Sequence, residues 1–160
     1  MIGDYVLTQA DILTNPTKTD IIGIASYPLD SHYVSRWLDA DRILRFEGGF
    51  FSGEVRPWAI PYRSLLPQAG EVANLLVPVA ASASHVAFAS LRMEPQYMLM
   101  GEAAGQAAAI TFESGSGAVD FHALDVALLQ GELRAHGSKL NNPTNLAGSP
   151  VISDRATSGE

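Results

Sequence analysis

The chain has 160 residues, 47% of them hydrophobic, which suits one folded domain with a real core. Its formal net charge is −7 and no run of basic residues occurs, so nucleic acids and anionic membrane surfaces are not expected as partners. It contains no cysteine, which excludes disulfides, thiol catalysis and a cysteine-ligated iron–sulfur cluster within the chain.

The N-terminal sequence shows no targeting signal. The first twenty residues lack both a basic start and a long apolar run, so no signal peptide is expected. No stretch approaches the roughly 20 apolar residues of a membrane helix. A cytoplasmic location is the default expectation, and a periplasmic or secreted one stays open if a signal was lost with the N-terminus.

The first half of the chain predicts antiparallel strands. Residues 8–11 are expected to start a short helical turn. Residues 32–38 alternate in character, which is typical of a strand with two different faces, and residues 39–41 suit a hairpin turn. Strands are expected at residues 20–27, 32–38, 42–46 and 50–60, so residues 20–60 should be mostly antiparallel strand.

The second half predicts a buried strand and a long helix. Residues 75–79 form a short apolar run that favours a buried strand. Residues 82–94 are polar and are expected to connect this strand to a helix over residues 95–112. Gly101 and Gly105 share one face of that helix. Because each glycine costs about 1 kcal/mol relative to alanine in a helix, we expect this face to be buried against something flat or bulky.

The C-terminal region predicts a second helix over residues 121–136. Asp120 is a suitable N-cap and Gly137 a suitable stop. The apolar residues Phe121, Leu124, Leu128 and Leu133 fall roughly on one face of this helix. From residue 141 onward the composition is rich in Asn, Pro, Gly, Ser and Thr, and a mostly disordered tail is expected.

Three ordered motifs in the second half resemble a known protein family. They are Asn-Leu-Leu-Val-Pro-Val (residues 74–79), Ser-Ala-Ser-His-Val-Ala-Phe-Ala-Ser-Leu-Arg-Met-Glu-Pro (82–95) and Gly-Glu-Ala-Ala-Gly-Gln-Ala-Ala (101–108). Together with residues 3–8, 26–32 and 60–67, they look like FAD-dependent oxidoreductases. The branch they resemble is distantly similar to the flavoprotein of heterodisulfide reductase, and some of its bacterial members are labelled xanthan-lyase-like. The likeness covers about residues 1–137, but the family's N-terminal half, with its glycine-rich nucleotide fingerprint, is absent.

The resemblance implies an α/β chain, or more narrowly an α+β fragment. Residues 1–67 would form an antiparallel β region on the substrate side. Residues 68–137 would supply the closing strand and helix of a Rossmann-like FAD domain plus a C-terminal helix, and residues 138–160 the tail. The implied reaction is hydride transfer between flavin and a small-molecule or carbohydrate substrate. FAD is the implied cofactor, and a separate N-terminal FAD-binding half is a possible partner.

Beside a flavin, the residues around the start of the long helix suit distinct tasks. The first-turn N–H groups of a helix have no intrahelical partners and carry partial positive charge, which Arg92 would reinforce near a reduced ring. His85 could move a proton to or from substrate. Catalytic roles are therefore expected for His85 and Arg92. Cofactor contacts are expected for Ser82, Ser84, Ser90, Arg92, Pro95, Gln96, Tyr97, Gly101 and Gly105.

Simpler interpretations exist for the same residues. A helix rich in small residues most often packs against another element, Arg92 could pair with Glu94 or Glu102, and a lone histidine such as His85 is more often structural. No metal-ligand spacing occurs. The chain could instead be a non-catalytic relic or a partner-binding domain. A weaker alternative is a carbohydrate-binding protein that uses Trp37, Trp58 and Tyr62.

Overall fold

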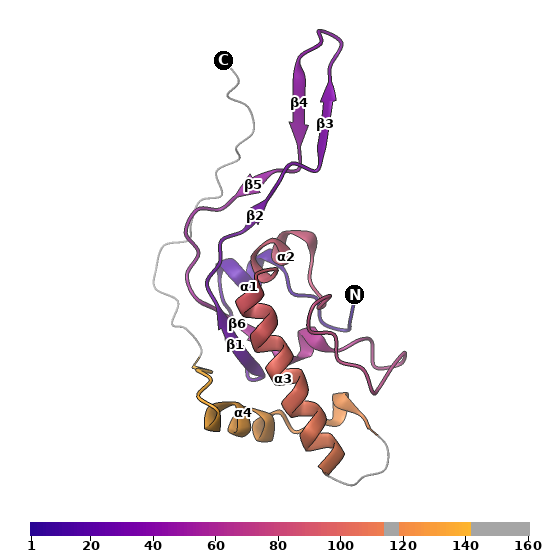
Figure 1. The fold of residues 1–160 in the computed structure, drawn as a ribbon, viewed down its shortest axis with the longest axis vertical. Coiled ribbons are helices and arrows are strands. Elements are labelled where there is room, and N and C mark those ends of the chain that lie inside the picture. The colour runs from indigo at the N-terminus through magenta and orange to yellow at the C-terminus, as the bar shows by residue number, and fades with distance from the viewer. Residues whose placement is uncertain (114–118, 142–160) are drawn as a thin grey trace.

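The computed structural model describes residues 1–113 and 119–141 (Figure 1). These residues form an α+β fold of small antiparallel sheets and several helices, as predicted. The helices are α1 (Gln9–Leu13), α2 (His85–Leu91), α3 (Glu94–Glu113) and α4 (Val126–Ala135), with 3₁₀ turns η1 (Tyr62–Leu65) and η2 (Phe121–Ala123). The strands are β1 (Ile21–Ala25), β2 (Asp30–Ser31), β3 (Ser35–Leu38), β4 (Leu44–Glu47), β5 (Phe50–Phe51) and β6 (Trp58–Pro61).

The core is built around the antiparallel pair β1–β6. Trp58, Ile60 and Ile22 are completely buried there. Helix α3 packs on β1, and Gly23 lets it approach, because a Cβ at that position would lie 3.2 Å from Cδ1 of Leu99. The N-terminal segment joins this core through Leu7, whose N–H donates to the carbonyl oxygen of Ser82 at 2.9 Å. The core therefore draws on residues from both sides of position 67.

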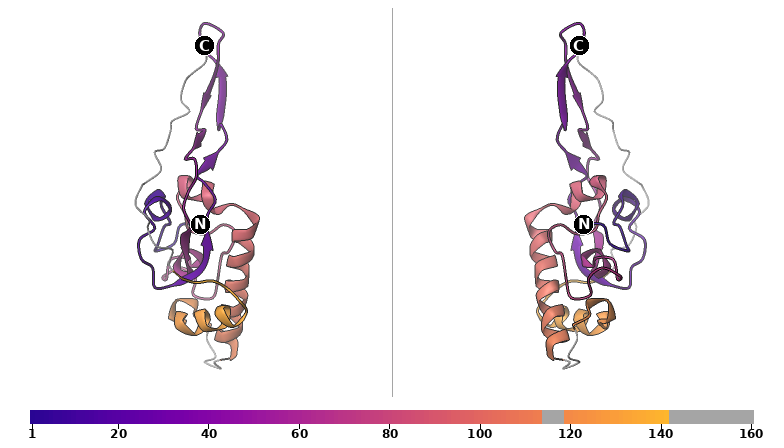
Figure 2. Two further views of the ribbon diagram at one scale, coloured as in Figure 1. Left: turned by 90° about the vertical axis from the view of Figure 1, so that its left-hand side faces the viewer. Right: turned by 90° about the vertical axis from the view of Figure 1, so that its right-hand side faces the viewer.

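The remaining strands form a long two-stranded ribbon that projects from the body (Figures 1 and 2). β2 pairs with β5 and β3 with β4, both antiparallel, which confirms the antiparallel prediction for residues 20–60. The hairpin turn predicted at residues 39–41 is also confirmed: the Asp39 N–H donates across it to the Ile43 carbonyl oxygen at 3.0 Å. Every residue of β3 and β4 is exposed, so neither face of this hairpin is part of the core.

Helix α3 confirms one prediction and corrects another. It spans the expected residues 95–112 without a break. Gly101 and Gly105, however, lie on the exposed side, and a Cβ at either position would meet nothing within 4 Å. The opposite side, with Met100, Ala103 and Ala107, is the one buried against the body. The close-approach prediction for the two glycines is therefore wrong among the described residues.

The segment before α2 also differs from the prediction. Residues 75–79 form no strand; Leu75 and Val79 are exposed, and the Val77 N–H donates to the carbonyl oxygen of Leu65 at 2.9 Å. Pro78 lacks an N–H, so it weakens this run as a member of a ladder. The expected polar connection over residues 82–94 contains α2, which begins after Ser84.

The C-terminal region is helical with shifted boundaries. Asp120 caps η2 rather than a long helix, and α4 begins later, after its own N-cap Asp125. This shift buries Leu129 together with Leu133 and leaves Leu128 exposed, contrary to the predicted face. Gly137, with φ of +95°, ends the helix as predicted. The expected tail lies outside the described residues from position 142 onward.

Candidate functional site

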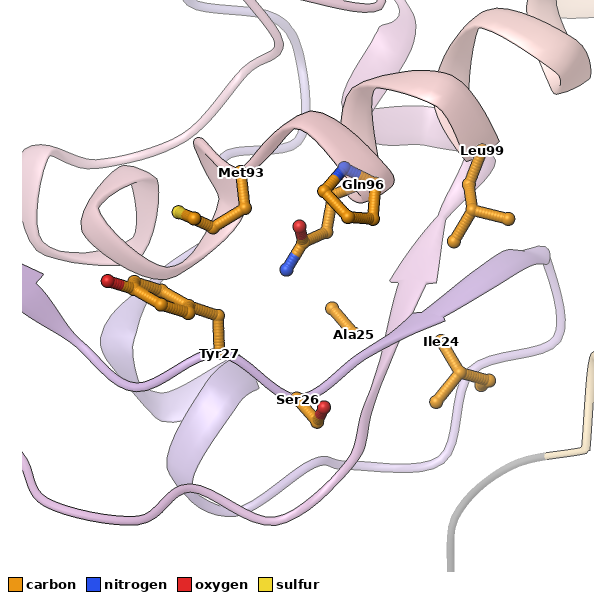
Figure 3. Close-up of a pocket in the computed structure, with 8 residues that line it drawn as sticks. Ile24, Ala25, Ser26, Tyr27, Met93, Gln96 and Leu99 are labelled. Atoms are coloured by element: carbon orange, nitrogen blue, oxygen red, sulfur yellow. The ribbon is translucent and has the colours of Figure 1, made fainter.

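A pocket of about 270 Å³ lies where the end of β1 meets the first turn of α3 (Figure 3). The strand side contributes Ile24, Ala25, Ser26 and Tyr27, and the helix side contributes Met93, Pro95, Gln96 and Leu99. Most of these side chains are apolar. Gln96 is the buried polar member, and its Nε2 donates to the carbonyl oxygen of Ser90 at 3.4 Å. The pocket thus combines apolar walls with one amide at the positive end of a twenty-residue helix.

A polar cluster of Tyr27, Asp30 and Arg92 borders this pocket. The Tyr27 hydroxyl donates to Oδ2 of Asp30 at 3.0 Å, and this hydrogen bond raises the pKa of Tyr27. Nη2 of Arg92 donates to the Asp30 carbonyl oxygen at 3.3 Å and lies 3.6 Å from Oδ2 of the same residue. Asp30 is thus the acidic partner of Arg92, in place of the Glu94 or Glu102 that the sequence suggested.

The three candidate serines all have partners within the chain. Oγ of buried Ser82 accepts the Gly3 N–H at 2.8 Å, and Oγ of Ser84 accepts the Ala87 N–H at 3.2 Å as the N-cap of α2. Ser90 donates to the Tyr27 carbonyl oxygen and accepts the Trp58 indole N–H. These hydroxyls stabilise the fold, and their contact with a cofactor stays a prediction.

The structure brings some of the candidate residues together and separates others. Pro95 and Gln96 line the pocket, with Ser90 and Arg92 next to it. Tyr97 is half-buried in the same turn; its N–H already donates to the Met93 carbonyl oxygen at 3.1 Å, and burial raises the pKa of its phenol. His85 is exposed at the start of α2, with its ring nearly perpendicular to that of Phe50 and the two ring centroids 6.2 Å apart. Pro95 and Gln96 are thus the candidates that line the pocket; those that do not are Ser82, Ser84, His85, Ser90, Arg92, Tyr97, Gly101 and Gly105.

The strand half of the pocket was missed as a site by sequence reasoning. Residues 24–27 were predicted only as strand, yet they form one wall. The available signal was the strand end itself, since ligands of α/β proteins often bind where strands stop. The sequence alone did not show which element would form the other wall, because β1 and α3 come together only through tertiary packing.

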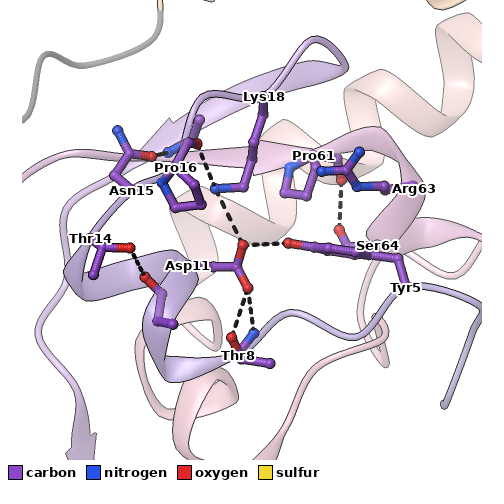
Figure 4. A network of polar contacts seen from close by, with 12 residues as sticks. Tyr5, Thr8, Asp11, Thr14, Asn15, Pro16, Lys18, Pro61, Arg63 and Ser64 are labelled. Atoms are coloured by element: carbon purple, nitrogen blue, oxygen red, sulfur yellow. Dashed lines mark hydrogen bonds and ion pairs between the residues drawn. The ribbon is translucent and has the colours of Figure 1, made fainter.

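A second polar network lies away from the pocket and joins the N-terminal segment (Figure 4). Oδ1 of Asp11 accepts the Tyr5 hydroxyl at 2.5 Å, and Oδ2 accepts the N–H and the hydroxyl of Thr8, each at 2.9 Å. Nζ of buried Lys18 lies 3.5 Å from Oδ1. Burial alone would raise the pKa of Asp11, but the hydrogen bonds from Tyr5 and Thr8, with the charge of Lys18, lower it. The contacts satisfy the carboxylate within the chain, which indicates a structural role.

Metal-binding clusters and membrane-spanning helices are both absent from the described residues. No group of three or more His, Cys, Asp or Glu side chains there is placed to hold a metal ion. No helix in the same part of the chain is both long and apolar enough to cross a membrane.

Comparison with known proteins identifies the family. Neither the curated proteins nor the solved structures gave a match. A family model described as FAD dependent oxidoreductase matches residues 1–133, which includes both walls of the pocket, the ribbon and most of α4. The chain therefore belongs to the FAD-dependent oxidoreductase family.

Proposed function

We propose that this chain forms the flavin-ring side of an oxidoreductase that transfers hydride between an organic substrate and FAD. The observation that carries the proposal is the pocket between β1 and α3. Its apolar walls suit a flat ring, and the start of α3 favours negative charge beside it. The finer relationship, to the branch that resembles the heterodisulfide reductase flavoprotein, is part of the same proposal and rests on the motifs alone.

The described residues fit one part of FAD and not the whole. The pocket volume of about 270 Å³ falls just below the roughly 300–1,000 Å³ of sites that enclose a drug-sized ligand. The sequence contains no Gly-x-Gly-x-x-Gly, the loop that holds a dinucleotide pyrophosphate at a helix N-terminus. A second, nucleotide-binding half therefore supplies that loop in this proposal, and the chain alone binds FAD weakly.

Each candidate residue then has a defined task. FAD, when bound, supplies the hydride chemistry. Gln96 and the first turn of α3 stabilise negative charge in the pocket, and Arg92 adds a cation whose position is fixed by Asp30. His85, exposed at the start of α2 and outside the pocket, holds or releases a proton at its imidazole on the substrate side.

A second candidate function is a non-catalytic domain that binds a partner chain. The internal hydrogen bonds of Ser82, Ser84 and Ser90 favour it, because those hydroxyls are occupied by the fold. The carbohydrate-binding alternative gains no support: Trp58 and Tyr62 are buried, so Trp37 is the exposed member of that set.

The pocket is tested by filling it. Met93 lines the pocket and is half-buried outside the core cluster, so Met93→Trp should block the ring without disturbing the core (Figure 3). Riboflavin titrated into the chain and followed by flavin fluorescence should bind weakly and saturably. Met93→Trp should weaken this binding at least about tenfold, or 1.4 kcal/mol.

The matched control is Met98→Trp, the same change at a methionine of α3 that is 73% exposed and does not line the pocket. It should bind riboflavin as the wild type does. Equal affinity in all three proteins, or no binding by the wild type, would remove the pocket from the flavin site.

A further inference from the structure

The side chain of Gln96 brings unused hydrogen-bonding groups into the pocket between β1 and α3. Gln96 is 5% exposed, and its amide extends from the first turn of α3 toward the β1 wall (Figure 3). Its Nε2 donates to the carbonyl oxygen of Ser90 at 3.4 Å, which is longer than the roughly 2.7–3.2 Å of most such hydrogen bonds. A carbonyl oxygen only accepts, so the Ser90 carbonyl fixes the amide nitrogen on its side. Among the described residues none donates to Oε1, which leaves this acceptor free.

The other polar side chains that line the pocket are either paired or turned away from it. The Tyr27 hydroxyl donates to Asp30, and the Tyr27 carbonyl oxygen accepts the hydroxyl of Ser90. The side chain of Ser26 points away from α3 (Figure 3). Within the part of the chain that the structure describes, Gln96 is therefore the polar side chain left to meet a ligand between apolar walls. A buried acceptor without a donor is unfavourable, so the arrangement suits a ligand that supplies one.

We propose that Gln96 is the specificity-determining residue of this pocket and that it recognises the imide edge of the flavin ring. The inference rests on the proposed function, which places the ring between β1 and α3. The imide edge carries one N–H group, at N3, between the carbonyl groups at C2 and C4. Oε1 of Gln96 accepts a hydrogen bond from N3–H, and the second N–H of Nε2 donates to a neighbouring carbonyl oxygen of the ring. One amide thereby satisfies a donor and an acceptor of the ligand together.

The start of α3 favours the same orientation of the ring. The N–H of Tyr97 donates to the Met93 carbonyl oxygen at 3.1 Å, and Gln96 comes just before this bond in the chain. The side chain of Gln96 therefore leaves the helix at its positive end. The carbonyl oxygens of the imide edge are the electron-rich part of the ring that such charge attracts, whereas the dimethylbenzene edge carries no polar atom. The apolar walls suit the rest of the ring.

The test measures how well the intact chain distinguishes riboflavin from 3-methylriboflavin, in which a methyl group replaces the hydrogen on N3. Titrations followed by flavin fluorescence give both dissociation constants. The wild type should bind riboflavin at least about tenfold more tightly, because the methyl group removes the donor and leaves Oε1 of Gln96 buried without a partner. Gln96→Met keeps a side chain of similar length without the amide, so it should bind the two ligands with equal affinity.

Gln106→Met is the matched control. It makes the same change further along α3, where the amide contacts His136 and does not line the pocket, so the preference for riboflavin should persist. Unchanged circular dichroism would show that both variants fold. A wild type that binds riboflavin and its 3-methyl derivative equally well would overturn the role of Gln96 and leave the flavin pocket in place. A preference that Gln96→Met retains would do the same, because it would come from a clash with another wall. A wild type that binds no riboflavin would remove the flavin pocket itself, and this inference with it.

Discussion

Asp11 shows how one side chain fixes the N-terminal segment. Its carboxylate accepts hydrogen bonds from Tyr5 and Thr8 and lies beside the ammonium of Lys18, whose side chain is 1% exposed. Burial lowers the pKa of Lys18, and the charge of Asp11 opposes that shift. Each of these two charged groups therefore stabilises the ionised form of the other where little water reaches them.

Asp11→Asn should lower the free energy of unfolding by roughly 3 kcal/mol at neutral pH, because it removes the ion-pair partner of a buried ammonium. Urea unfolding followed by circular dichroism measures the loss. Asp39→Asn is the control, since Asp39 also has a lowered pKa but pairs with Arg45 on the exposed ribbon. A loss no larger for Asp11→Asn than for Asp39→Asn would contradict the structural role.

Asp11→Asn should also change how the stability of the fold depends on pH. The pKa of Asp11 is lowered in the folded chain, so its contribution to stability is complete above the unfolded value near 4. This contribution is lost as the pH falls through the lower folded pKa. The free energy of unfolding of Asp11→Asn should therefore fall less steeply than that of the wild type as the pH drops below about 4. An equally steep fall in both proteins would show that other carboxylates cause the acid sensitivity.

At the scale of elements, α3 shows what a residue pattern specifies and what it leaves open. The sequence predicted the extent of α3 correctly, because Pro95 suits a first helical turn and most of residues 96–112, apart from Gly101 and Gly105, are good helix formers. It did not predict which side of the helix meets the body. The four-residue spacing of Gly101 and Gly105 defines one face of the helix. The opposite face, with Met100, Ala103 and Ala107, is the one buried against the body.

Gly101→Ala and Gly105→Ala should each stabilise the isolated chain by up to about 1 kcal/mol, since alanine is the better helix former and open space surrounds both positions. Thermal unfolding measures this directly. Gly3→Ala should act in the opposite direction, because its Cβ would collide with the carbonyl oxygen of Leu66. Destabilisation by the α3 alanines in the isolated chain would mean that the glycine face is packed after all.

The run at residues 75–79 shows a second limit of sequence reasoning. Short apolar runs are compatible with strands, but a strand exists only where a neighbour accepts its backbone hydrogen bonds. Here the Val77 N–H bonds to Leu65, and no strand lies alongside among the described residues. The hairpin at residues 35–47 was predictable for the converse reason: its partner is local, joined by a turn with its own hydrogen bonds.

At the scale of the whole molecule, the motifs indicated the family and the structure shows how their residues are arranged. Pro95, Gln96 and Arg92 could be chosen from the sequence because they surround a predicted helix start. The pocket wall at residues 24–27 could not, because it is some seventy residues away in sequence and reaches α3 only in the folded chain. In the proposed function the chain is half of a flavin site, with a ring pocket and no pyrophosphate loop.

The most direct test of this half-site compares FAD, riboflavin and ADP as ligands of the isolated chain. If the chain holds only the ring end, FAD and riboflavin should bind with similar weak affinity, and excess ADP should displace neither. FAD bound tightly at one equivalent and displaced by ADP would contradict the half-site, because it would place a dinucleotide cradle within this chain.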